Sequence, residues 1–164
     1  MAAFRIILLL SSWLVVIVDC LRPNPAVVHH NLPYCDDAGP QHVLDLYLPP
    51  GQRRYPTLVF IHGGSWHTGD KDNIFYPYQV LGKRFATRGV GVAVADYRLS
   101  PQVRHPAHAL DAARAFAWTR HNVATYGGDP NRVFLFGHSA GAHLVMLLAL
   151  DPKYLESAGC SPKD

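Results

Sequence analysis

Short apolar runs recur along the chain, separated by polar and glycine-rich stretches. Residues 42–48 alternate, with Leu44, Leu46 and Leu48 on one face, and this period of two predicts a half-buried strand. Apolar runs at 57–61, 90–95 and 132–136 predict strands buried within a parallel sheet. A further short strand is expected at 26–31.

Two segments carry helical patterns. The first opens at Pro106, shows a broad apolar stripe and continues to about Tyr126, where a Gly-Gly-Asp-Pro sequence ends it. The second covers residues 140–150 and stops at Asp151 and Pro152. Strands that alternate with helices are typical of βαβ units. The sequence therefore predicts an α/β fold, with a mainly parallel sheet of about five strands and helices on both faces.

The N-terminal segment has a different character. A single positive charge in residues 1–5 precedes a largely apolar run at 6–18, which suits a signal peptide and is short for a membrane span. We expect residues 1–20 to be a signal peptide, with an uncleaved signal anchor as the alternative. Residues 21–164 then form the folded part of a secreted or secretory-pathway protein, which meets a membrane only if the segment stays uncleaved.

Composition and charge exclude several functions. The net charge of the 164 residues is +3, and no run of Lys and Arg is longer than two, so nucleic-acid binding is not expected. Nucleotide-binding glycine motifs are missing from the sequence, and so are H-E-x-x-H and C-x-x-C motifs, so we expect no cofactor and no metal. Cys35 and Cys160 could pair or could remain as two thiols. Several histidines are expected at the surface: His29, His30, His105, His108 and His121.

The strongest chemical signal is the pentapeptide Gly-His-Ser-Ala-Gly at 137–141. It follows a predicted strand and precedes a predicted helix, which is the setting of a nucleophile elbow. Side chains flanking Ser139 would collide in so tight a turn, which accounts for Gly137 and Gly141. A second motif, His-Gly-Gly-Ser-Trp at 62–66, also follows a buried strand, and its glycines let backbone N–H groups approach a ligand oxygen. A simple tight turn is the alternative for this second motif.

Together the two motifs resemble those of α/β-hydrolase-fold serine esterases, specifically the hormone-sensitive-lipase and small-carboxylesterase type. The resemblance extends over roughly residues 33–163 and includes LDLYLP at 44–49, DYRLSP at 96–101 and GGDP at 127–130. It implies hydrolysis of a small-molecule ester or related acyl compound through an acyl-enzyme. By position it makes Ser139 the nucleophile, gives the oxyanion-hole N–H groups to Gly63, Gly64 and Ala140, and places Trp66 and His138 in the substrate pocket.

One departure from the esterase pattern concerns the base and the acid. This fold orders its triad as Ser, then Asp or Glu, then His. His143 lies one helical turn after Ser139, and Asp96 precedes the serine and suits a structural role better. We therefore expect the chain to be the N-terminal portion of an esterase, with little activity alone. The alternative is a non-catalytic hydrolase-fold protein with a binding or scaffold role. A downstream Asp and His would favour the enzyme, and a stop codon after Asp164 the alternative.

Overall fold

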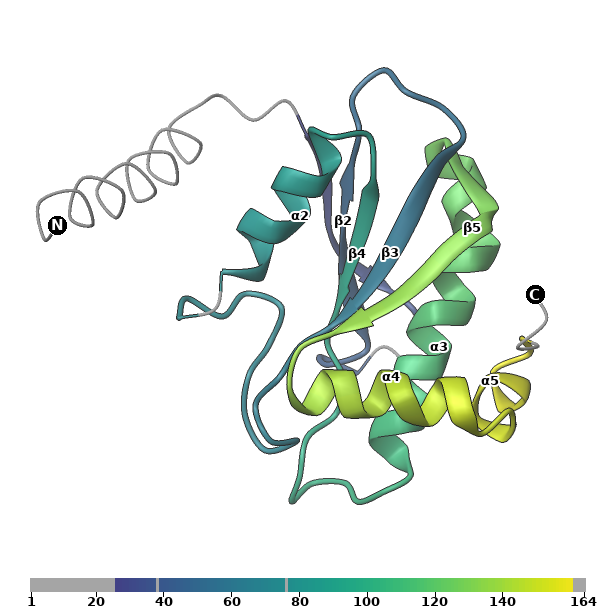
Figure 1. The fold of residues 1–164 in the computed structure, drawn as a ribbon. Coiled ribbons are helices and arrows are strands. Elements are labelled where there is room, and N and C mark those ends of the chain that lie inside the picture. Colours follow the sequence, from purple (N-terminus) through teal and green to yellow (C-terminus); the bar gives the residue numbers. More distant parts are fainter. Residues whose placement is uncertain (1–25, 38, 76, 161–164) are drawn as a thin grey trace, which may run out of the picture.

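The strands and helices of the computed structural model follow the predicted alternation (Figure 1). The structure describes residues 26–37, 39–75 and 77–160, and the proposed signal segment lies outside them. The elements are β1 (Val27–Pro33), β2 (Val43–Leu48), β3 (Tyr55–Ile61), α2 (Tyr78–Ala86), β4 (Gly91–Ala95), α3 (Ala107–Asn122), the 3₁₀ helix η1 (Val123–Tyr126), β5 (Gly128–Gly137), α4 (Ala140–Leu150) and α5 (Lys153–Ser157). All five predicted strands and both predicted helices are confirmed, whereas α2 and α5 were not predicted.

The five strands form one sheet in the order β1-β2-β4-β3-β5. β3 pairs in parallel with both β4 and β5, while β2 pairs antiparallel with β1 and β4. Only β2 thus runs against the others among the described strands. This confirms the mainly parallel sheet, and it brings the carboxyl ends of β3, β4 and β5 to the same edge.

Helices cover both faces of the sheet (Figure 1), and each face has its own core of buried side chains. Leu44, Val59, Ile61 and Ala93 face α3, α4 and α5. The alternate strand positions face α2 and form a smaller cluster, in which Tyr47, Phe60, Val92 and Val94 pack against Tyr78 and Ala86 of the helix. Successive residues of each strand therefore point into two different cores, as expected for a sheet covered on both sides.

The prediction of a half-buried strand at 42–48 was wrong, because both faces of β2 are buried. Asp45 on the second face is fully buried, and its carboxylate lies 3.1 Å from Nζ of Lys71 and accepts the N–H of Asn31 at 2.9 Å. Burial raises the pKa of Asp45, but these hydrogen bonds and that of His30 outweigh it and lower the pKa overall. A buried charge is tolerated at this position because it is paired.

Three further observations concern a histidine, the cysteines and the possibility of a membrane span. His108 is buried rather than exposed, and its Nε2 lies 3.2 Å from Oγ of Ser100. No disulfide joins Cys35 and Cys160, both of which the structure describes. None of the helices in the described ranges has the length and apolar character needed to cross a bilayer.

Gly82 allows α2 to pack directly on the sheet. A Cβ placed on this glycine would lie 2.4 Å from Cδ2 of Tyr47, whose ring is fully buried. The helix axis could not keep its present distance from β2 with any larger residue at this position.

We predict that Gly82→Ala destabilises the protein, although alanine exceeds glycine in helix propensity by about 1 kcal/mol. Overpacking a buried site costs about 1–3 kcal/mol, and here the added methyl meets an immobile ring. Thermal unfolding measures the change, with Lys83→Ala as a control in the same helix that should be nearly neutral. A higher melting temperature for Gly82→Ala would contradict this packing.

Candidate active site

The turn at Ser139 is strained. Ser139 links β5 to α4 with φ 50° and ψ −116°, a region that residues other than glycine rarely adopt. Such a conformation costs about 1–3 kcal/mol and persists only when the surrounding structure enforces it. The side chain is exposed at the carboxyl edge of the sheet. This is the geometry of a nucleophile elbow, in which the hydroxyl stands clear of the backbone.

The two flanking glycines permit the turn. A Cβ on Gly137 would lie 2.5 Å from the carbonyl carbon of Gly141, and a Cβ on Gly141 would lie 2.1 Å from the carbonyl oxygen of Ile61. The second distance shows that α4 starts in direct contact with the end of β3. The prediction that side chains at these positions would collide is confirmed.

The His-Gly-Gly-Ser-Trp segment packs against this turn. A Cβ on Gly63 would lie 2.8 Å from Nδ1 of His138 and 3.2 Å from Cβ of Ser139. Gly64 has φ +120°, and the next two residues, Ser65 and Trp66, also have positive φ values of 52° and 62°. The two motifs that the sequence singled out are therefore adjacent in space.

The three candidate oxyanion donors have different partners. The N–H of Gly63 points to the hydroxyl of Tyr78 at 3.4 Å. The N–H of Gly64 has no acceptor within the described ranges, and that of Ala140 is the first of α4, where no intrahelical acceptor exists. Gly64 and Ala140 are thus better placed to donate to a ligand than Gly63. The assignment of all three to an oxyanion hole stays a prediction.

Tyr78 is a neighbour of the site that the sequence did not indicate. Its hydroxyl lies 3.1 Å from Nδ1 of His138 as well as near the Gly63 N–H. Tyr78 belongs to α2, the helix that was not predicted, so no sequence signal pointed to it. Together with His138 it lines a mainly apolar cavity of about 330 Å³ beside the elbow, formed by Phe60, Pro77, Tyr78, Leu81, Phe136, Gly137 and His138.

Neither neighbouring histidine is hydrogen-bonded to the Ser139 hydroxyl. The backbone N–H of His143 donates to the carbonyl of Ser139 at 3.1 Å, and the His143 ring meets Trp66 edge-on at 5.2 Å. His138 is directed to Tyr78 instead. Within the part of the chain that the structure describes, the Ser139 hydroxyl has no hydrogen-bond partner. Trp66 is half-buried against α4 and does not line the cavity beside the elbow.

A buried polar group supports the loop that carries the glycines. His62 is fully buried, its Nδ1 lies 2.7 Å from the carbonyl oxygen of Gly63, and its ring stacks on Tyr97 at 4.3 Å. Nε2 of His62 lies 3.8 Å from Asp96, whose carboxylate accepts the backbone N–H of Lys71 at 2.5 Å. Burial lowers the pKa of His62 and raises the pKa of Asp96 to about 7. Asp96 thus has the structural role expected of it.

Comparison with known proteins gives a consistent result. Residues 44–159 match the BD-FAE family. The chain is 40% identical over 124 residues to Esterase LipQ of Mycobacterium tuberculosis, covering 73% of this chain and 28% of that protein. It is also 40% identical over 119 residues to a probable isoprenylcysteine alpha-carbonyl methylesterase of Oryza sativa, covering 72% and 27%.

Solved structures show the same relationship. Esterase B from Lactobacillus rhamnosis superimposes with a TM-score of 0.73 at 30% identity, and the match covers 98% of this chain and 54% of that enzyme. A related crystal structure of that esterase is described as inhibited by a tributyrin phosphonate. This chain spans little more than a quarter of the length of the first curated relatives, at 28% and 27%.

The raised pKa of Asp96 predicts how stability depends on pH. Between the ordinary value of 3.8 and about 7, the folded state keeps a proton that the unfolded state releases, so Asp96 makes stability fall as pH rises across this window. Asp96→Asn removes this contribution, because an amide has no proton to lose. It can still accept the Lys71 N–H and can donate toward His62.

The melting temperature should therefore fall less for Asp96→Asn than for the unaltered protein as the pH rises from about 4 to about 7. His62, with its lowered pKa, contributes the opposite slope in both proteins. Glu156→Gln, a carboxyl-to-amide change on the exposed surface of α5, should leave the slope unchanged. If the melting temperatures of the unaltered protein and Asp96→Asn changed in the same way with pH, the raised pKa of Asp96 would be contradicted.

Proposed function

The chain belongs to the BD-FAE family, and we propose that it carries the nucleophile and oxyanion hole of a serine esterase that acts on small carboxylic esters. The single observation that carries this proposal is the enforced positive φ of Ser139 beneath the glycine loop. In the reaction the Ser139 hydroxyl attacks the ester carbonyl, the alcohol leaves, and water then releases the acid from the acyl-enzyme. Related acyl compounds would follow the same course.

Negative charge develops on the carbonyl oxygen when Ser139 attacks. The N–H groups of Gly64 and Ala140 are oriented by the backbone before substrate arrives, and the positive end of α4 lies beside them. Such preorganised donors contribute roughly 3–4 kcal/mol each to stabilising the transition state. Gly63 would add a third donor if its N–H left the Tyr78 hydroxyl.

The proposal places the base and its acid partner outside the described residues. A serine nucleophile needs a histidine that accepts its proton and a carboxylate that orients that histidine. No described side chain does either for Ser139. The described residues alone would therefore turn over esters very weakly. The proposal also retains residues 1–20 as a signal for the secretory pathway, which rests on their apolar run alone.

The test uses the protein expressed from its complete reading frame, with p-nitrophenyl acetate and longer-chain p-nitrophenyl esters as substrates. Ser139→Ala should lower kcat/KM by about 10³-fold or more, because the covalent route is lost while the fold is kept. Ser157→Ala, which removes a hydroxyl on α5, is the matched control and should retain full activity. Circular dichroism verifies that both variants are folded. An unchanged kcat/KM for Ser139→Ala, or no esterase activity in the unaltered protein, would overturn the proposal.

A further inference from the structure

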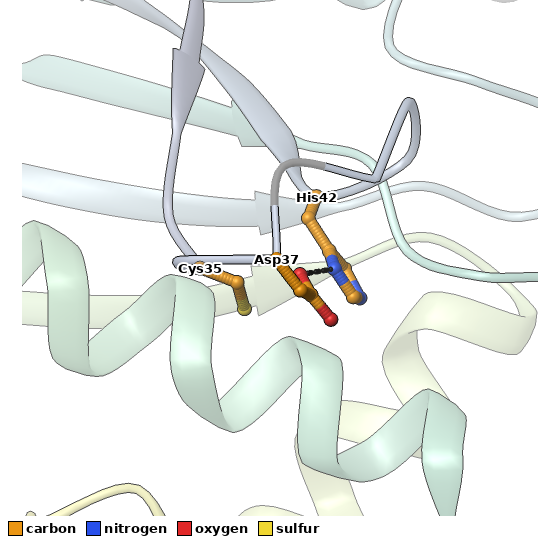
Figure 2. Close-up of side chains that lie close together, drawn as sticks. All are labelled: Cys35, Asp37 and His42. Atoms are coloured by element: carbon orange, nitrogen blue, oxygen red, sulfur yellow. Dashed lines mark hydrogen bonds and ion pairs between the residues drawn. The ribbon is translucent and has the colours of Figure 1, made fainter.

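Three metal-ligating side chains converge away from the active site, in the connection between β1 and β2. Figure 2 shows Cys35, Asp37 and His42 grouped beside α3. One potential ligand atom from each residue lies within 4.8 Å of the other two. Nδ1 of His42 is 2.5 Å from Oδ1 of Asp37. This is the only such group of three found among the described residues.

The backbone holds His42 firmly in place. Its ring is 2% exposed, its N–H donates to the carbonyl of Gly39 at 2.8 Å, and its own carbonyl accepts the N–H of Tyr34 at 3.0 Å. The ring also packs against that of Tyr34, with centroids 5.5 Å apart. A ligand that is fixed before the ion arrives loses little conformational freedom when it binds.

Both ring nitrogens of His42 face carboxylates. Nδ1 faces Asp37, and Nε2 lies 3.3 Å from Oδ1 of Asp111, a fully buried residue of α3. Nε2 is itself buried and makes no hydrogen bond of acceptable geometry with any described group. A neutral imidazole carries a proton on only one nitrogen, so its other lone pair would point at a carboxylate oxygen. A cation on the Asp37 side removes that repulsion and leaves the proton on Nε2, toward Asp111.

We propose that Cys35 Sγ, a carboxylate oxygen of Asp37 and Nδ1 of His42 bind a zinc-type divalent ion. Thiolate, imidazole and carboxylate are the three side-chain donors of zinc sites. A histidine ligand commonly directs its second nitrogen to a carboxylate, and Asp111 occupies that position. Donor atoms about 2.0–2.3 Å from a tetrahedral zinc lie within 4.8 Å of one another, and the separation of these three ligand atoms meets that condition.

The surroundings provide access to the cluster and hold Asp111 in place. A surface cavity of about 340 Å³ lined by Tyr34, Cys35, Asp36, Asp37 and Arg114 opens onto the cluster, which gives an entry path and room for a water as fourth ligand. Arg98 binds Asp111 through two hydrogen bonds of 2.8 and 2.7 Å, and Arg114 lies 3.3 Å from the same carboxylate. Burial raises the pKa of the Cys35 thiol, so an ion that binds there displaces the thiol proton.

The site would fasten the β1–β2 connection to α3 through His42 and Asp111. It replaces the expectation of no metal drawn from the sequence. That expectation relied on known motifs such as C-x-x-C. Cys35, Asp37 and His42 match no such motif, and they come together only because the connection between β1 and β2 folds back.

Cobalt(II) is the probe, because a cobalt–thiolate bond gives a charge-transfer band in the near ultraviolet and tetrahedral cobalt gives strong visible bands. The protein from its complete reading frame, stripped with chelator, is titrated with Co²⁺ and then with competing Zn²⁺. We expect saturable bands at one equivalent, displacement by zinc, and a higher melting temperature with zinc. Cys35→Ser should abolish the charge-transfer band, whereas Cys160→Ser, which removes the other thiol of the described chain, should retain it.

Asp37→Asn provides a second variant that cannot fail by unfolding the core, since 63% of its side chain is exposed. It should weaken cobalt binding by at least the roughly tenfold lost when a hydrogen-bond partner of a metal ligand is removed, while keeping the thiolate band at saturation. If the protein gave no thiolate band, if the band survived in Cys35→Ser, or if Asp37→Asn bound cobalt as tightly as the unaltered protein, the proposal would be wrong.

Discussion

The contact between the end of β3 and the start of α4 determines the rest of the site. The carbonyl of Ile61 comes so close to Gly141 that no side chain fits between them, and the tight turn that allows this approach holds Ser139 at its positive φ. Parallel pairing of β3 with β5 fixes where the turn begins, because Ile61 and Gly137 are partners in the register. The glycine loop after β3 then lies against the elbow. The sheet register and one helix start thus create the geometry that an acyl-transfer site requires.

Buried polar groups hold the loops on this edge of the sheet. Asp96 at the end of β4 anchors the Lys71 backbone, and the Lys71 side chain reaches the buried Asp45 of β2. His62 meanwhile packs on Tyr97, whose hydroxyl donates to the His62 carbonyl at 3.2 Å. These contacts connect three strands to the loop that carries Gly63 and Gly64. Removing one partner of such a contact would leave a buried polar atom unpaired. The free-energy cost of that unpaired atom exceeds the net stabilisation that the hydrogen bond provides.

The sequence predicted those features that depend on local patterns. Continuous apolar runs identified β3 and β4, and the glycine spacing around Ser139 identified the elbow. Sequence patterns did not predict elements or burial that depend on residues far apart in the chain. α2 escaped prediction because Gly82 interrupts its pattern and no side chain caps its start, yet Gly82 is the residue that packs on Tyr47. The second buried face of β2 depends on α2 and on Lys71, both far away in the sequence. The partners of His42 and His108 likewise come from other elements, so periodicity could not indicate their burial.

The central claim is that the strained turn makes Ser139 the reactive nucleophile. The most direct measurement is covalent labelling of the protein from its complete reading frame with a p-nitrophenyl alkylphosphonate, followed by peptide mass spectrometry. The account predicts one adduct per chain, located on Ser139, with loss of labelling when the protein is denatured beforehand. An adduct on another residue, or equal labelling of Ser139 in the denatured protein, would contradict it, since reactivity would then not arise from the folded turn.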